Sequence, residues 1–159
     1  MARRLRSVDL DFIESAPLRL VFTAEVRAHP ETVYRALADD VAGWPSWFTS
    51  VTAARPTEDG AGREVRIRGG TVLRESILAA DPGERYTYRV DESSTPGPKA
   101  LLEEWRLTPA GTGTRVRWTF AADGSAAFRF ALRLGRPGMG RAFREAVRNL
   151  DRRLGGAAA

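Results

Sequence analysis

The sequence predicts an α+β domain in which a seven-stranded antiparallel sheet precedes a long C-terminal helix. Apolar and polar side chains alternate over residues 18–26, as in a half-buried strand. Residues 51–122 contain six further short strand-like runs, separated by turns rich in glycine and proline. Apolar residues recur at helical spacing over 139–154. Because tight turns cannot connect parallel strands, we expect consecutive antiparallel pairing.

Two short helices are expected after the first strand. Residues 29–39 place Pro30 where the first turn of a helix tolerates proline. Residues 39–51 contain Pro45, which cannot donate a backbone hydrogen bond, so this second helix is expected to be short or broken. This second segment carries three large aromatic side chains, Trp44, Trp47 and Phe48.

The domain is expected to span residues 17–154. Residues 1–16 mix charges of both signs with few large apolar groups, which predicts an N-terminal extension that frays. Residues 155–159, GGAAA, have nothing to bury and are expected to form a disordered tail. Residues 125–138 fit either a strand or a helix, and Pro137 is expected to separate them from the helix that follows.

Composition excludes several kinds of chemistry. The chain of 159 residues has no cysteine, so it has neither a disulfide nor a thiolate ligand or nucleophile. The one histidine, His29, rules out histidine-rich metal clusters and stands at a helix-capping position. We therefore expect no metal and no cofactor.

Charge and hydropathy limit the expected partners. The net charge is +5, but Glu145 and Asp151 interrupt the arginine face of the terminal helix, which argues against nucleic acid. No stretch approaches the roughly 20 apolar residues of a membrane span, and the N-terminus lacks the apolar run of a secretory signal. The expectation is a cytoplasmic protein without integral membrane association, and the oligomeric state stays open.

Three motifs in order carry a family resemblance. They are Pro-Glu-x-Val at 30–33, the tryptophan-rich turn at 44–47, and Gly-Thr-Arg-Val at 113–116. With the order of elements, they make the chain from Leu18 to Leu154 resemble the START-like superfamily, the SRPBCC-type domains of polyketide cyclase/dehydrase and lipid-transport proteins. The resemblance implies a helix-grip fold, a curved sheet around a long helix with a cavity between them. Since members include carriers, cyclases, hydrolases and quinone-binding chaperones, it does not imply one function.

Inward-facing apolar side chains are the candidate ligand-binding residues. Those on the strands and the terminal helix either line a cavity or fill it, and the aromatic cluster after the first strand forms either a lid or a satellite core. The candidates are Trp44, Trp47, Phe48, Ile67, Leu73, Tyr86, Tyr88, Leu101, Trp105, Trp118, Phe120, Met139, Phe143 and Val147.

Two carboxylates occupy strand positions that point to the same inner face as the neighbouring apolar residues, and they are the candidate catalytic residues. Glu75 falls between Leu73 and Ile77, and Glu103 falls two residues before Trp105. Burial would raise the pKa of either carboxyl and suit it to acid–base work on an enolisable ketone. Alternatively, a bulge or rim position exposes them, or an arginine pairs with them. The arginines considered are of opposite parity, and we expect them on a solvated outer face: Arg68, Arg74, Arg89 and Arg106.

The leading functional hypothesis is binding of a small hydrophobic or aromatic molecule, such as a lipid, quinone or polyketide-like compound, between sheet and terminal helix. One alternative is a cofactor-independent polyketide aromatase or cyclase that uses an inward carboxylate. A second alternative is a macromolecular adaptor with a solidly packed interior.

Overall fold

A computed structural model describes residues 1–157 of the chain. One antiparallel sheet dominates it, with the strands in the order β2-β8-β7-β6-β5-β4-β3. Apart from the return of β2 to pair with β8, neighbours in the sheet are consecutive along the chain, as the short turns predicted. The strands are β2 (Leu18–Val26), β3 (Val51–Pro56), β4 (Gly62–Ile67), β5 (Thr71–Asp81), β6 (Arg85–Ser93), β7 (Pro98–Ala110) and β8 (Gly113–Gly124).

Two short helices follow β2, as predicted. The first is α2 (Pro30–Ala38), which begins at a proline whose missing N–H costs nothing in a first turn. The second is the 3₁₀ helix η1 (Val41–Ser46), which contains Pro45 and does not extend into a regular α-helix. η1 packs beside β3 and brings the aromatic cluster under the sheet.

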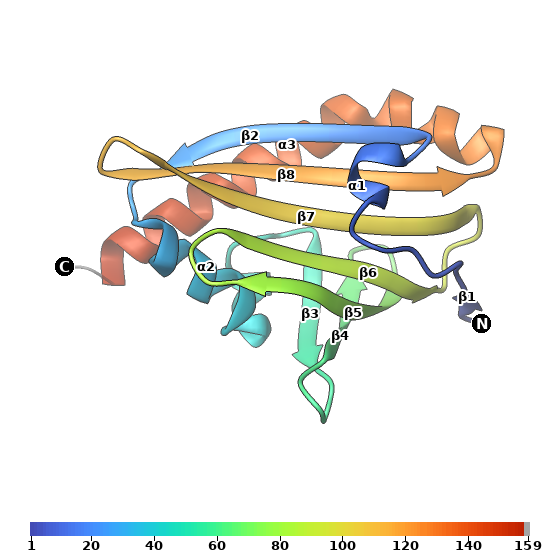
Figure 1. Ribbon diagram of the computed structural model, residues 1–159, viewed down its shortest axis with the longest axis horizontal. Helices are drawn as coiled ribbons and strands as arrows, with labels where there is room; N and C mark the ends of the chain where they lie inside the picture. Colours follow the sequence, from blue (N-terminus) through green and yellow to red (C-terminus); the bar gives the residue numbers. More distant parts are fainter. Residues whose placement is uncertain (158–159) are drawn as a thin grey trace.

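The sheet curves around α3 (Ala126–Ala157), which crosses its concave face, while α1 (Phe12–Ser15) lies on the opposite face (Figure 1). The main core lies between the concave face, α2, η1 and α3. This arrangement is the helix-grip fold that the resemblance implied. None of the helices within residues 1–157 is long and apolar enough to cross a membrane.

The prediction that residues 1–16 fray is wrong. The strand β1 (Arg3–Arg4) pairs with the end of β6, and α1 places Phe12 and Ile13 in a second, smaller core. That core covers the outer face of β7 and β8, where Ala100, Leu102 and Ala121 are fully buried. The sequence signal was weak because the segment is short. An apolar outer sheet face nevertheless needs a cover.

The prediction of a break at Pro137 is also wrong, because α3 runs unbroken through it. Residues 133–138 are all exposed, so water can reach the carbonyl that loses its partner to the proline. Ser125 starts the helix by accepting a hydrogen bond from the backbone N–H of Phe128 at 3.1 Å. Residues 155–157 continue the helix, contrary to the disordered tail expected there, and residues 158–159 lie outside the described residues.

Candidate functional site

A cavity of about 250 Å³ lies between the concave face of the sheet, η1 and α3. Several lining residues are partly exposed, among them Ile67, Leu73, Phe120 and Met139, which puts the mouth between the β4–β5 hairpin and the middle of α3. Most of the lining is apolar. The lining residues are Trp44, Phe48, Ser50, Val51, Arg63, Val65, Ile67, Leu73, Glu75, Tyr88, Glu103, Trp118, Phe120, Met139 and Ala142.

The polar part of the lining is built around a buried ion pair. Arg63 donates through Nε to the carboxylate of Glu75, and both side chains are 2% exposed. The guanidinium carbon lies 4.2 Å from the ring centre of Trp44 and 4.0 Å from that of Tyr88. The faces of both rings therefore attract the guanidinium through cation–π interactions, in a region shielded from water.

Glu103 forms a second polar group beside the ion pair. Its carboxylate accepts hydrogen bonds from the hydroxyl of Tyr88 and, at 3.1 Å, from the indole N–H of Trp118. The same Tyr88 hydroxyl accepts a 3.1 Å bond from the indole N–H of Trp105. Three neighbouring strands therefore hold Glu103 in one orientation.

Burial shifts the protonation of both carboxyls toward the neutral form. Desolvation raises the pKa of Glu75 to about 7, with Arg63 opposing the shift and the charge of Glu103 reinforcing it. Desolvation also raises the pKa of Glu103, against the hydrogen bond from Tyr88 and the charge of Arg63. Although burial disfavours its charged form, Arg63 keeps a raised pKa because Glu75 lies against it. Arg63 is therefore permanently charged, while a glutamate can exchange a proton near neutral pH.

One nitrogen of this cluster is unsatisfied. Nη1 of Arg63 is buried and has no hydrogen-bond partner within the described structure. A buried donor without an acceptor costs on the order of 1–3 kcal/mol, and more when it is charged. An oxygen atom brought into the cavity by a ligand would remove that cost.

Local backbone geometry brings the ion pair together. Gly62 lies so close to β5 that a Cβ at this position would stand 2.3 Å from the carbonyl oxygen of Glu75. The β5–β6 pairing shifts register immediately before Glu75. A glycine and a bulge therefore set the approach of β4 and β5 where the two charged side chains meet.

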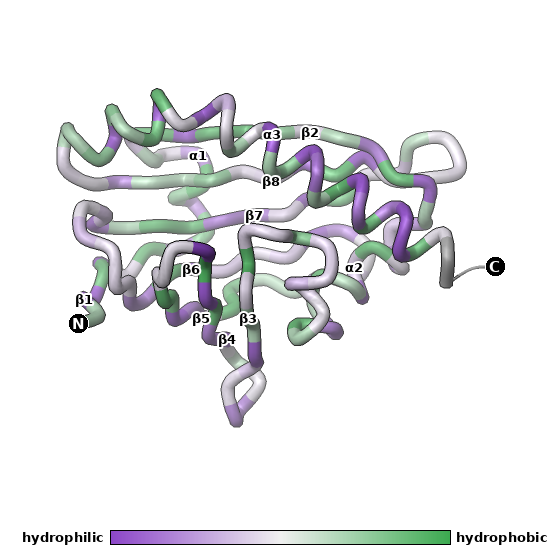
Figure 2. Tube along the Cα trace, turned by 180° about the vertical axis from the view of Figure 1, so that it is seen from behind, coloured by the Kyte–Doolittle hydropathy of each residue, from purple (hydrophilic) through white to green (hydrophobic). Residues whose placement is uncertain are grey.

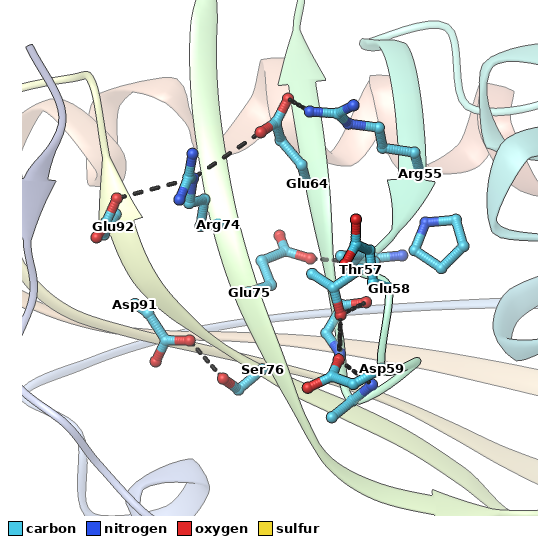
Figure 3. A pocket seen from close by; sticks show the side chains of 14 residues that line it. Arg55, Thr57, Glu58, Asp59, Glu64, Arg74, Glu75, Ser76, Asp91 and Glu92 are labelled. Atoms are coloured by element: carbon cyan, nitrogen blue, oxygen red, sulfur yellow. Dashed lines mark hydrogen bonds and ion pairs between the residues drawn. The ribbon is translucent and has the colours of Figure 1, made fainter.

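A second, polar hollow lies on the other side of the ion pair. This outer groove of about 640 Å³ follows the β3–β4 hairpin and the neighbouring parts of β5 and β6 (Figure 3). Several of its charged side chains pair with one another, as Arg55 does with Glu64 at 3.2 Å. Arg63 and Glu75 line both hollows, so the pair separates the apolar cavity from the groove.

The candidate catalytic residues both face the interior. Glu75 is 4% and Glu103 8% exposed, and both line the cavity. The four arginines considered as their partners bind elsewhere: Arg74 to Glu64 and Glu92, Arg89 to Asp91, Arg106 to Glu104, and Arg68 to the carbonyl of Thr49.

The structure brings ten of the sixteen candidate residues to the cavity and leaves six away from it. The ten are Trp44, Phe48, Ile67, Leu73, Glu75, Tyr88, Glu103, Trp118, Phe120 and Met139. The other six are core residues that do not line the cavity: Trp47, Tyr86, Leu101, Trp105, Phe143 and Val147. The aromatic cluster of η1 is no exposed lid, because Trp44 and Trp47 are 1% and 0% exposed.

Arg63 is the charged cavity-lining residue that sequence reasoning missed. It has the same parity as Ile67, one of the inward-facing candidates, and as Val65, which also lines the cavity. Only four arginines of the opposite parity were considered as partners for the glutamates, and Arg63 was not among them. A signal was nevertheless present in the sequence. Arg63 occupies an inward-facing position of its strand, and it pairs directly with the inward-facing Glu75 in the β4–β5 register.

Comparison with known proteins gives a family and a set of relatives. The family model described as polyketide cyclase / dehydrase and lipid transport matches residues 17–155. Uncharacterized proteins of Mycobacterium tuberculosis and Mycobacterium bovis are 37% identical over 150 residues, which is 91% of this chain and 89% of theirs.

Solved structures share the fold at low sequence identity. XoxI of Bacillus cereus has a TM-score of 0.69 and 16% identity, over 89% of this chain and 98% of that one. A START superfamily protein of Mycobacterium smegmatis has a TM-score of 0.66 and 12% identity, over 87% and 98% of the two chains. At these identities the likeness concerns the fold alone.

Proposed function

Since the chain belongs to the polyketide cyclase/dehydrase and lipid transport family, we propose that it binds one small, neutral, mainly apolar molecule whose oxygen faces Arg63. Family and fold are consistent with hydrophobic ligand binding. The observation that carries the finer proposal is the buried, unpartnered Nη1 of Arg63 in a residue that lines the cavity.

Cavity size sets the scale of the ligand. An apolar cavity of roughly 150 Å³ is enough to hold benzene. The 250 Å³ found here suits a molecule of one or two rings and is too small for a diacyl lipid or a long folded polyketide chain. The apolar lining supplies affinity, and the few polar groups supply orientation. A cavity of this size also argues against the adaptor with a solidly packed interior.

Charge favours a neutral ligand over an anionic one. The cavity holds one permanent cation, Arg63, and two carboxyls, Glu75 and Glu103. Arg63 is already neutralised when either glutamate is ionised, so a ligand carboxylate would add an uncompensated buried charge unless both glutamates took up protons. A ketone, quinone or phenol oxygen can accept from Nη1 without that cost.

Isothermal titration calorimetry with a matched pair of probes tests the proposal. At pH 7.5 we expect 2-acetylnaphthalene to bind in a 1:1 ratio, and 2-naphthoate, of nearly the same shape, to bind at least tenfold more weakly. Loss of a charge-assisted hydrogen bond is worth about 1.5–3 kcal/mol, so Arg63→Met should weaken the ketone by roughly tenfold or more.

The control for this experiment is Arg66→Met, which removes an arginine that is 62% exposed on the same strand. Its affinity for the ketone should equal that of the wild type. Equal affinity for ketone and carboxylate, or an Arg63→Met variant that is folded and binds the ketone normally, would overturn the proposed role of Arg63.

Acid–base catalysis at the same site is the second candidate function, favoured by the raised pKa of Glu75, about 7. An ionised Glu75 would take an α-proton from a bound ketone while Arg63 stabilises the developing enolate oxygen. Returning the proton to oxygen gives the enol, and returning it to carbon restores the ketone, so no co-reactant is consumed.

Exchange of the methyl protons of 2-acetylnaphthalene in D₂O measures this step directly by NMR. If the protein is an enzyme, it will accelerate exchange above the buffer rate. Glu75→Gln will then abolish the acceleration while the variant still binds the probe. Glu103→Gln distinguishes the two carboxyls in the same assay. Binding without acceleration in the wild type would exclude acid–base chemistry on this class of ketone and leave the binding function intact.

A further inference from the structure

The first half of α3 carries an exposed apolar pair. Phe130 and Leu134 are 60% and 67% exposed, and apart from Met1 they are the only large apolar side chains classed as exposed among the described residues. They lie four residues apart and therefore share one face of the helix. The hydropathy colouring in Figure 2 shows this half of α3 as an alternation of apolar and polar positions alongside β2.

The same stretch is strongly basic. Residues 124–144 contain five arginines and no acidic residue, so their charge equals the net charge of +5 of the whole chain. Arg133, Arg136, Arg141 and Arg144 are exposed, and none of them forms an ion pair within the described structure. The remainder of the protein is neutral on balance, so the positive charge is concentrated at this helix.

We infer that this half of α3 docks on an anionic lipid surface, with Phe130 and Leu134 inserted among the acyl chains and the arginines at the headgroups. Exposed apolar side chains flanked by basic ones are the features of helices that lie in a membrane interface. Each arginine near an anionic leaflet adds electrostatic attraction to the membrane surface. A second copy of this chain is a poor occupant because two such basic faces repel each other.

Docking has a consequence for the cavity, although it does not depend on the cavity being used. Met139 lies at the cavity mouth, five residues after Leu134, which is about 7.5 Å along the helix. A lipid surface at Phe130 and Leu134 would therefore lie close to the opening through which an apolar molecule enters or leaves.

Co-sedimentation of the full chain with vesicles tests the inference. We expect binding to vesicles of phosphatidylcholine with 30% phosphatidylglycerol and at least tenfold weaker binding to phosphatidylcholine alone. The double variant Phe130→Ser/Leu134→Ser should lose at least tenfold in partition, as should Arg133→Glu/Arg136→Glu. The control Arg66→Glu/Arg148→Glu changes net charge equally at exposed positions away from the pair and should lose less than either.

Several results would overturn the inference. One is failure to bind the anionic vesicles. Another is binding that Phe130→Ser/Leu134→Ser leaves unchanged, since this would be charge adsorption without insertion. A third is dimerisation in analytical ultracentrifugation that the same variant abolishes, because Phe130 and Leu134 would then pack against a second copy of the chain instead of lipid. Tighter binding to duplex DNA than to the anionic vesicles, at equal salt, would assign the arginines to nucleic acid instead.

Discussion

Arg63 and Glu75 are two charged side chains in a mainly apolar interior, and their energetics follow from what surrounds them. Removing two such groups from water costs several kcal/mol each, and mutual attraction offsets this only where geometry and hydrogen bonds are good. Here two aromatic faces cover the guanidinium, and one of its nitrogens has no acceptor. A pair held with an unsatisfied donor at a cavity is better explained by binding than by stability.

The pKa of Glu75 predicts a defined pH dependence of stability. The pKa of this group is 4.5 in an unfolded chain and about 7 in the folded protein, so the folded state holds the extra proton between these values. The contribution of Glu75 to the unfolding free energy is therefore fully present below the unfolded pKa and is lost as pH rises through about 7. The loss amounts to about 3 kcal/mol.

Glu75→Gln should remove that pH dependence. The difference in unfolding free energy between wild type and variant, measured by urea titration at pH 5, 6, 7 and 8, should move in favour of the variant by up to about 3 kcal/mol as pH rises. Subtracting the two proteins cancels the titration of groups that they share. A difference that stays constant over this pH range would mean that Arg63 holds Glu75 ionised in the folded protein, contrary to the raised pKa.

Parity explains which residues of the site could be predicted. Glu75 and Glu103 were placed inside because each alternates with large apolar residues, and that alternation holds along β5 and β7. The same rule applies to Arg63 but competes with the general rule that arginines are solvated. Whether Trp105 and Phe143 line the cavity or pack away from it depends on side-chain positions that alternation does not encode.

At the scale of elements, strands and turns were predictable, whereas the covering segments were not. Turn residues and period-two alternation located β2 to β8 because each strand turns one face toward the main core. The N-terminal segment has no periodicity of its own, and its order comes from the outer faces of β7 and β8 beneath it. The continuity of α3 through Pro137 depends on exposure at 133–138, which only the fold determines.

The N-terminal segment should therefore contribute measurably to stability. Phe12 is 6% exposed and packs in the small outer core with Val8 and Ile13. Replacing a buried phenylalanine with alanine typically lowers the unfolding free energy by about 3 kcal/mol, and we expect Phe12→Ala to have an effect of about that size. Leu134→Ala, at an exposed position, is the matched control and should change it little. Equal stabilities of wild type and Phe12→Ala would mean that the segment is detached in solution.

At the scale of the whole molecule, the sheet, η1 and α3 surround a space that the side chains do not fill. Family resemblance suggested such a space, but sequence could not give its volume, because volume depends on how far each aromatic side chain reaches. The large aromatics that pack behind the cavity reduce it to about 250 Å³. That value is what restricts the proposed ligand to one or two rings.

The two methionines allow ligand binding in this cavity to be tested directly. The chain has two, and Met139 lines the cavity while Met1 is fully exposed at the N-terminus. In protein labelled with ¹³C at the methionine methyls, saturating 2-acetylnaphthalene should shift the Met139 signal and give nuclear Overhauser contacts to the aromatic protons. The Met1 signal should not move. Two unchanged methyl signals at a probe concentration near its solubility limit would contradict ligand binding in this cavity.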